Sequence, residues 1–145
     1  MAHRIQLILA IALMLWVVIF GMARCVKAET VTIITDGGGD LIAYIARANQ
    51  YRKDGTKVAI IGSCASACTV FLGLPQGQVC VDRQAWIGFH QTSSVKPQPE
   101  AVRASYDDLL WQQYPDEIKR AVGRLTPNLT WLRGREIIPA IPQCR

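Results

Sequence analysis

The sequence of 145 residues predicts a single α/β domain with a mostly parallel sheet. Two observations predict this class. Residues 31–35 and 57–61 are apolar runs rich in β-branched side chains, with the length of buried strands. Between them, residues 41–52 carry apolar side chains at helical spacing. A strand, a helix and a second strand form a βαβ unit, in which the two strands are parallel and the crossover is right-handed.

The N-terminus has the composition of a secretory signal. A short basic end precedes an apolar run over residues 7–23 that contains no charged residue. Residues 26–28 match the small-residue pattern of a cleavage site, so we predict a signal peptide over 1–28 and an exported, periplasmic domain over 29–145. The alternative is an uncleaved anchor, because the run is near the minimum length of a spanning helix. Contact with the membrane is then expected through this segment only.

The charge of the chain argues against nucleic acid as a partner. The formal net charge is +5 at pH 7, from 16 basic and 11 acidic residues. Three of the basic residues and none of the acidic ones lie in the predicted signal, which leaves 13 basic against 11 acidic residues, or +2. No basic cluster is interleaved with aromatic side chains, as it is in nucleic-acid-binding surfaces. We therefore expect no nucleic-acid partner.

Four cysteines remain in the predicted exported chain: Cys64, Cys68, Cys80 and Cys144. An even number of cysteines in an exported protein indicates two disulfides, and the sequence leaves all three pairings open. The alternatives are a metal site of three cysteines with His90, and a redox pair in Cys64 and Cys68. The spacing of that pair is not the CxxC of thiol oxidoreductases. We favour disulfides and expect no metal and no cofactor.

Two special turns follow the first two predicted strands. Residues 36–40 contain three consecutive glycines, which permit backbone angles closed to other residues, and end in Asp40, a good helix N-cap. Residues 62–68 form a turn of small residues that leads into an apolar run over 69–74, typical of a short buried helix. Parallel strands bring their carboxyl ends to one edge of a sheet, where ligands bind. We therefore expect the two turns to meet at one site.

The third major strand is predicted over residues 85–89. It follows a short strand over 79–81 and a tight connection, and it ends at His90. Residues 91–99 are polar and contain prolines, which indicates a loop. The strand therefore delivers the second and last histidine of the chain to the same edge of the sheet as the two turns.

The C-terminal part is predicted to be helical and then extended. Residues 100–114 have apolar side chains at helical spacing, and Pro115 begins a second helix that runs to about residue 125. Residues 126–145 are rich in proline, and the prolines within residues 137–142 exclude a regular central strand there. We expect an extended tail held in place by Cys144.

Ser66 and His90 carry the candidate chemistry. A serine is a weak nucleophile until a base takes its proton, and histidine is the usual base near neutral pH. The tetrahedral intermediate of acyl transfer also needs N–H donors, for which Gly38, Gly39 and Ala67 are the candidates as an oxyanion hole. The structural alternative is that Ser66 caps the following helix and that the glycines only turn the chain.

These residues resemble the Clp-protease/crotonase-like superfamily, and most of all its exported bacterial branch of small Clp-fold, serine-protease-like proteins. The resemblance covers residues 31–91 and is weaker toward the C-terminus. It implies a spiral of βαβ units and a peptidase that acts on a peptide or protein substrate. By position it makes Ser66 the nucleophile, His90 the base, and Gly38 and Ala67 the oxyanion-hole donors. It also implies a homo-oligomer with the C-terminal helices as the contact surface.

The third member of the catalytic triad departs from the family pattern. The family's peptidases place an aspartate before the C-terminal helix, but residues 126–132 in the corresponding stretch contain none. Asn128 is the candidate there, because an asparagine orients the imidazole in Cys-His-Asn enzymes. Asp107, Asp108 and Asp116 are nearer to the histidine in sequence but lie on predicted helices. A non-catalytic binding or structural module of the same fold is the alternative function.

Overall fold

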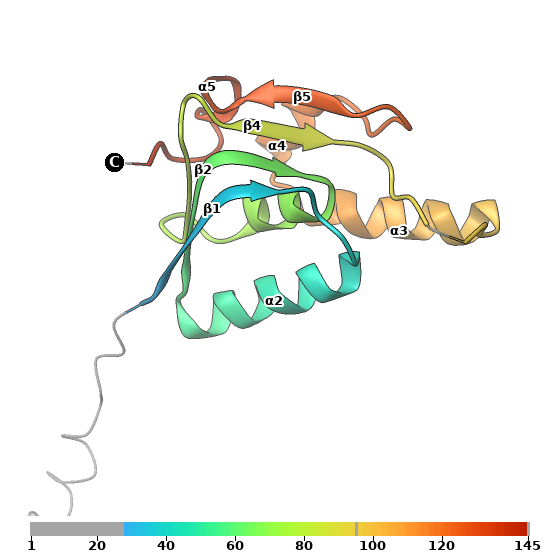
Figure 1. Ribbon diagram of the computed structural model, residues 1–145, viewed down its shortest axis with the longest axis horizontal. Helices are drawn as coiled ribbons and strands as arrows, with labels where there is room; N and C mark the ends of the chain where they lie inside the picture. Colours follow the sequence, from blue (N-terminus) through green and yellow to red (C-terminus); the bar gives the residue numbers. More distant parts are fainter. Residues whose placement is uncertain (1–27, 95, 145) are drawn as a thin grey trace, which may run out of the picture.

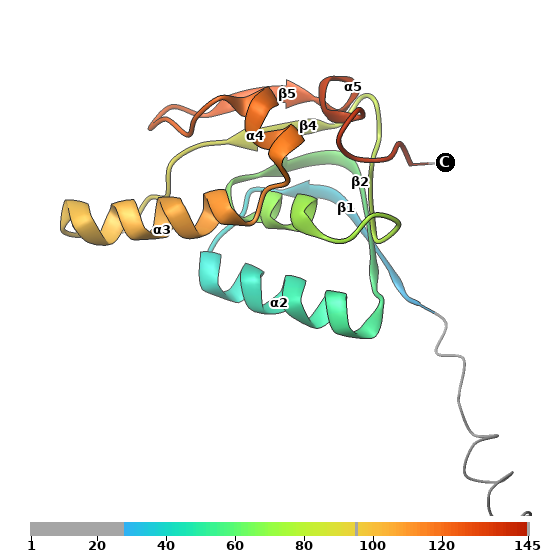
Figure 2. The same cartoon turned by 180° about the vertical axis from the view of Figure 1, so that it is seen from behind.

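The structure is a computed structural model that describes residues 28–94 and 96–144. The predicted signal peptide or anchor over 1–28 lies outside the described residues, apart from Ala28. Within the described part, none of the helices has the length and the apolar character needed to cross a membrane. The chain forms two layers, because the helices gather on one face of the sheet (Figures 1 and 2).

In the described residues, five strands form one mixed sheet in the order β1-β2-β4-β5, and β3 also pairs with β2. Their bounds are β1 Thr30–Asp36, β2 Lys57–Ala65, β3 Val79–Val81, β4 Trp86–Phe89 and β5 Thr130–Arg133. The pairs β1·β2, β2·β3 and β2·β4 are parallel, and β5 runs antiparallel to β4. The predicted α/β class with a mostly parallel sheet is confirmed.

The helices cover the face of the sheet that Figure 2 shows in front. Their bounds are α2 Leu41–Asp54, the 3-10 helix η1 Ser66–Gly73, α3 Glu100–Gln112, α4 Asp116–Val122 and α5 Gly134–Ile137. Asp40 is the N-cap of α2, as predicted, and its side chain accepts the N–H of Ala43 at 2.9 Å. The core between the two layers is apolar, and its most buried members include Val58, Ile60, Val70, Phe71, Ile87, Phe89, Leu110 and Ile118.

Strand β2 is four residues longer than predicted, so the turn that follows it is sharper. Gly62 permits this extension, because a Cβ at this position would lie 1.9 Å from the carbonyl oxygen of Ile34. Residues 63–65 then pair with β4, and residues 63 and 64 also pair with β1. The chain therefore turns between Ala65 and Ser66 rather than over the whole small-residue stretch.

The prediction of an extended tail after residue 126 was wrong in part. Strand β5 pairs residue by residue with β4, and α5 follows it directly. Beyond α5 the tail is irregular, as expected, and it is held where Val81 forms an isolated bridge with Gln143. The prolines of the tail lie outside β5, which is why the strand forms in a proline-rich segment.

The four cysteines form two disulfides, Cys64–Cys68 and Cys80–Cys144. The prediction of two bridges is confirmed, and the second one does tie down the C-terminal tail. This pairing removes the thiols needed for the alternative metal site, and the described residues contain no cluster of metal-binding side chains. The two bridges indicate an oxidising compartment.

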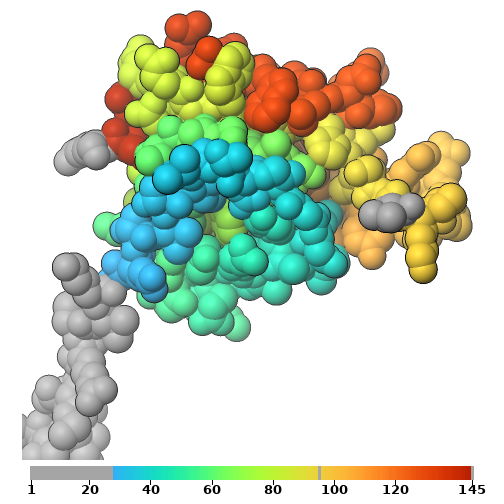
Figure 3. Space-filling model, in the orientation of Figure 1, coloured from blue at the N-terminus to red at the C-terminus, as the bar shows by residue number. Residues whose placement is uncertain are grey.

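No helix of the described residues covers the other face of the sheet, which faces the viewer in Figures 1 and 3. Large apolar side chains on or beside this face are exposed: Ile34, Ile61, Trp86, Leu129 and Trp131. The guanidinium of Arg133 stacks on the Trp86 ring at 3.3 Å from its centroid. The helical layer and its edge, not this face, contain the candidate site described next.

Candidate active site

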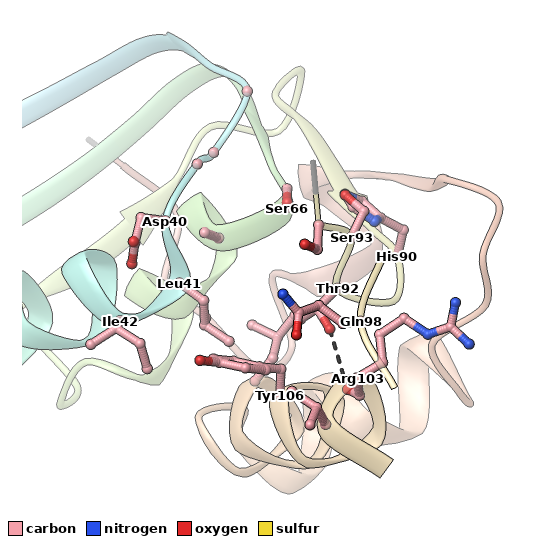
Figure 4. A pocket seen from close by; sticks show the side chains of 17 residues that line it. Asp40, Leu41, Ile42, Ser66, His90, Thr92, Ser93, Gln98, Arg103 and Tyr106 are labelled. Atoms are coloured by element: carbon pink, nitrogen blue, oxygen red, sulfur yellow. Dashed lines mark hydrogen bonds between the residues drawn. The ribbon is translucent and has the colours of Figure 1, made fainter. Parts of the chain in front are cut away.

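A pocket of about 830 Å³ opens at the carboxyl ends of the parallel strands (Figure 4). Its walls come from the glycine turn after β1, the turn at Ser66 after β2, His90 after β4, the following loop, and α3. The predicted meeting of the two special turns at one edge is therefore observed. The pocket also brings His90 to the same place.

Ser66 has a strained backbone. Its φ of 57° makes it the one non-glycine residue with a positive φ in the described part of the chain. This left-handed conformation costs a residue with a side chain about 1–3 kcal/mol and persists where the surroundings impose it. A serine on a sharp turn from a strand into a helix is the arrangement of the nucleophile elbow. No side chain caps η1, so the alternative role of Ser66 as a helix cap is not what the structure contains.

Contacts on the helical side hold Ser66 in this conformation. The hydroxyl of Thr69 donates to the carbonyl oxygen of Ser66 at 2.5 Å. Because that proton is used, the Tyr114 hydroxyl is the donor in its 2.6 Å bond to the Thr69 hydroxyl. Burial raises the pKa of the Tyr114 phenol, which keeps it protonated and able to donate. The Cys64–Cys68 disulfide spans the same turn.

The glycine turn packs directly against the turn at Ser66. A Cβ on Gly38 would lie 2.7 Å from both the Ser66 Cβ and the Ala67 nitrogen, and the φ of Gly38 is 84°. One carboxylate oxygen of Asp36 accepts the Gly38 N–H at 2.8 Å and the Tyr44 hydroxyl at 2.6 Å. Burial and the neighbouring Asp36 raise the pKa of Tyr44 to about 12. Asp36 therefore fixes the turn.

The oxyanion-hole prediction changes in one respect. The Gly38 N–H is bound to Asp36, so in this geometry it is not available to a substrate. The N–H groups of Gly39 and Ala67 have no acceptor among the described residues, and both residues line the pocket. These two remain as the donor pair, and Gly38 instead provides the close packing that places them together.

His90 is half-buried, and its Nδ1 atom is hydrogen-bonded to the carbonyl oxygen of Gln91. A carbonyl only accepts, so Nδ1 carries the proton and the Nε2 lone pair is free in the neutral ring. This is the tautomer that a general base needs. Ser66 and His90 line one pocket, but within the described structure no hydrogen bond joins them. Such bonds often form only when substrate is bound.

Asn128 is not brought to the site. Its side chain is exposed, it does not line the pocket, and no hydrogen bond joins it to His90 in the described chain. Its backbone carbonyl accepts the Thr126 hydroxyl at 2.8 Å instead. The partner of the His90 Nδ1 atom is thus a backbone group, which no residue-type pattern reveals.

The outer wall of the pocket is more apolar. It is formed by residues of α2 and α3, namely Leu41, Ile42, Val102, Tyr106 and Leu110. Figure 4 shows Leu41 and Tyr106 across the pocket from Ser66. Arg103 also lines this wall, and the dashed line in Figure 4 marks the 3.4 Å contact between the Thr92 hydroxyl and the Arg103 carbonyl.

Sequence reasoning missed several residues that hold the site. Asp36 and Tyr44 fix the glycine turn, and Thr69 fixes the carbonyl of Ser66. The role of Asp36 was visible in the sequence, since an aspartate two residues before a turn glycine commonly accepts the N–H of that glycine.

No protein-family model and no curated protein matches this chain, so its function is argued from this site.

Proposed function

We propose that the protein is an exported, periplasmic serine hydrolase of the peptidase type, built as a Clp/crotonase-like spiral of βαβ units. The observation that carries this proposal is the strained backbone of Ser66 in a pocket that also holds His90 and the N–H groups of Gly39 and Ala67, which have no acceptor among the described residues. Strained non-glycine residues cluster at active sites, where the strain places a reacting group. The two disulfides and the predicted N-terminal signal support the compartment.

The reaction is acyl transfer to Ser66. The His90 Nε2 atom takes the hydroxyl proton while the Ser66 oxygen forms a bond to the substrate carbonyl carbon. The carbonyl π electrons move to its oxygen, and the resulting oxyanion accepts the N–H groups of Gly39 and Ala67. The C–N bond then breaks, the Nε2 proton goes to the leaving amine, and an acyl-enzyme remains. A water molecule repeats the two steps and releases the acid.

The apolar wall indicates the kind of substrate. Side chains of α2 and α3 offer an apolar surface beside the reacting centre, which fits an apolar side chain of a peptide. The reaction is expected to be slow, because a carbonyl beside the histidine lacks the full negative charge of the usual aspartate. Loss of that charge lowers kcat by a factor of about 10⁴ in a complete triad.

A homo-oligomer is also proposed, and light scattering of the purified protein measures its oligomeric state.

Fluorophosphonate labelling of the purified full chain tests the proposal. We expect one phosphonyl group per chain, mapped by mass spectrometry to Ser66 and absent in Ser66→Ala. Ser93 is the matched control, because it also lines the pocket but has an ordinary backbone conformation, so Ser93→Ala keeps the label. His90→Ala lowers the labelling rate at least about a hundredfold. A folded protein that is unlabelled, or labelled at Ser93, contradicts the proposal.

A non-catalytic binding module of the same fold is the second candidate. The observation in its favour is that no hydrogen bond joins Ser66 to His90 in the described structure. This candidate predicts that the folded, disulfide-bonded protein resists the fluorophosphonate. It also predicts that Ser66→Ala leaves peptide binding unchanged, as measured by calorimetry.

A further inference from the structure

We propose that Asp107 takes the place of the missing acid and acts on His90 through a single peptide group. Asp107 is a positioning residue in this scheme, since it touches neither Ser66 nor the pocket in the described structure. The inference deepens the proposed function and rests on it for its catalytic meaning. Its structural part concerns the tautomer of the His90 ring. This part does not depend on the proposed function and is measured in a separate experiment.

The peptide group between Gln91 and Thr92 connects the two residues. Its carbonyl oxygen is the partner of the His90 Nδ1 atom. Its N–H, on the other side of the same planar unit, donates to the Asp107 Oδ1 atom. The Thr92 hydroxyl donates to that same oxygen at 2.7 Å. One carboxylate on α3, one peptide and one imidazole therefore form a continuous chain of hydrogen bonds.

Such a chain transmits part of the carboxylate's charge. The N–H and the C=O of a trans peptide point in opposite directions, so a negative charge at the N–H end makes the carbonyl oxygen more negative. Hydrogen bonds in a chain polarise one another, and bonds to ionised groups are the stronger ones. A more negative Gln91 oxygen favours the proton on Nδ1 and stabilises the imidazolium that forms when Nε2 takes the Ser66 proton. These are the two tasks of the aspartate in a complete triad.

The surroundings single out Asp107 among the carboxylates. Asp36 is occupied by the glycine turn, and Asp40 accepts the N–H of Ala43 at the start of α2. Asp108, the next residue on α3, is exposed, and its side chain makes no hydrogen bond within the described chain. Arg103, the one cationic residue of α3, lines the pocket and provides no carboxylate. Asp107 is thus the carboxylate linked to the ring.

The segment after His90 is also held from the opposite side. The Gln91 N–H donates to the carbonyl oxygen of Thr126 at 2.8 Å. The peptide group in question therefore has fixed neighbours at both ends, Thr126 before it and Asp107 after it. A fixed peptide holds the ring at a fixed angle, which a mobile loop does not.

The tautomer of His90 provides the first readout. The full chain is labelled with ¹⁵N-histidine and carries His3→Gln, so that His90 is its one histidine. We expect Nδ1–H and an unprotonated Nε2 in the neutral ring, as judged from the ¹⁵N shifts. Asp107→Ala converts this into a mixture of both tautomers, whereas Asp108→Ala, the matched control, leaves the spectrum unchanged.

The rate of fluorophosphonate labelling at Ser66 provides the second readout. We expect Asp107→Ala to lower it about tenfold, less than the ~10⁴ of a directly bonded acid. Asp107→Asn keeps an oxygen acceptor but no charge, so it lowers the rate by about threefold while the tautomer persists. Thr92→Val keeps the peptide N–H and loses only the hydroxyl bond to Asp107, so it lowers the rate less than Asp107→Ala does.

The outcomes separate the inference from the proposed function. Labelling of Ser66 with equal rates and spectra in Asp107→Ala and Asp108→Ala leaves the function intact and overturns the role of Asp107. A Thr92→Val loss as large as that of Asp107→Ala also overturns it, because anchoring of the loop then explains the effect. A tautomer change in Asp107→Ala, with no labelling of the parent protein, supports the connection between Asp107 and His90 and contradicts the proposed hydrolase function. Near-ultraviolet circular dichroism verifies that each variant is folded.

Discussion

The two halves of the pocket are built in different ways. The serine half, residues 36–40 and 64–69, is held mainly by groups close in sequence: a disulfide across four residues, Asp36 bonded two residues ahead, and Thr69 bonded three residues back. The bond between Thr69 and Tyr114, 45 residues apart, is its long-range contact. The histidine half, residues 90–94 with α3, is held by the bonds of Thr92 to Asp107, 15 residues away, and of Gln91 to Thr126. The first half therefore relies mostly on local contacts, whereas the second depends directly on how α3 is docked.

The attachment of α3 supports this difference. Leu110 is the one residue buried on this helix, and the N-terminal end of α3 extends away from the rest of the molecule in both views (Figures 1 and 2). Elements with few buried side chains open at lower free energy than the core. A strained nucleophile needs a rigid frame, whereas a base that moves a proton tolerates adjustment when substrate binds.

Gly38→Ala is the largest expected change and tests the rigidity of the serine half. Its Cβ meets backbone and Cβ atoms 2.7–2.8 Å away that have no room to move, and its φ is 84°. We expect a loss of more than about 3 kcal/mol in the free energy of unfolding, measured with urea. The matched control is Gly77→Ala, because Gly77 has a similar φ of 88° but no atom within 4 Å of an added Cβ. We expect this control to lower the free energy of unfolding by about 1–2 kcal/mol. Equal losses would show that the two turns do not press together.

Tyr44→Phe has a smaller expected effect on the same half. It removes the hydroxyl that donates to Asp36, for a loss of about 1 kcal/mol in the free energy of unfolding near neutral pH. Tyr51→Phe is the matched control, because both rings lie 5.6 Å from Phe71 and the Tyr51 hydroxyl makes no hydrogen bond in the described chain. A loss in the control as large as in Tyr44→Phe would assign the effect to ring packing.

Alkaline pH sharpens this comparison. Burial and Asp36 raise the pKa of Tyr44 from 10.0 to about 12 in the folded protein. A raised folded-state pKa means that the contribution of this phenol to stability is complete below pH 10 and disappears as the pH rises to about 12. The stability difference between the parent and Tyr44→Phe should therefore shrink over this interval. A difference that stays constant up to pH 12 would contradict the bond to Asp36.

The same contrast explains which features the sequence could predict. The two turns were predictable because each is a short run of small residues after an apolar strand, and parallel pairing alone brings them together. His90 was placed correctly, since a strand end is also a local feature. The extra length of β2 and the strand β5 were missed, because they depend on the pairing of both with β4. Pairing partners distant in sequence leave no local pattern.

Asn128, predicted as the third member of the triad, does not line the pocket in the described structure, for a related physical reason. Position along the chain pointed to Asn128, and Asp107 was set aside because it lies on a helix. A helical carboxylate, however, reaches the backbone of a loop that packs beside the helix, as Asp107 does with the Thr92 N–H. Only the docking of α3 against the loop decides this contact, and a single sequence does not encode it in any short motif.

Asn128→Ala has the smallest expected effect and tests the histidine half against its sequence-based assignment. Because the side chain is exposed and bonds to no part of the site in the described chain, we expect the fluorophosphonate labelling rate to stay within about twofold. The free energy of unfolding should change by less than about 0.5 kcal/mol. Asp107→Ala, measured beside it, should slow labelling about tenfold through the peptide that His90 contacts. A larger loss of labelling rate in Asn128→Ala than in Asp107→Ala would support Asn128 as the third member of the triad, and would require its loop to move toward His90.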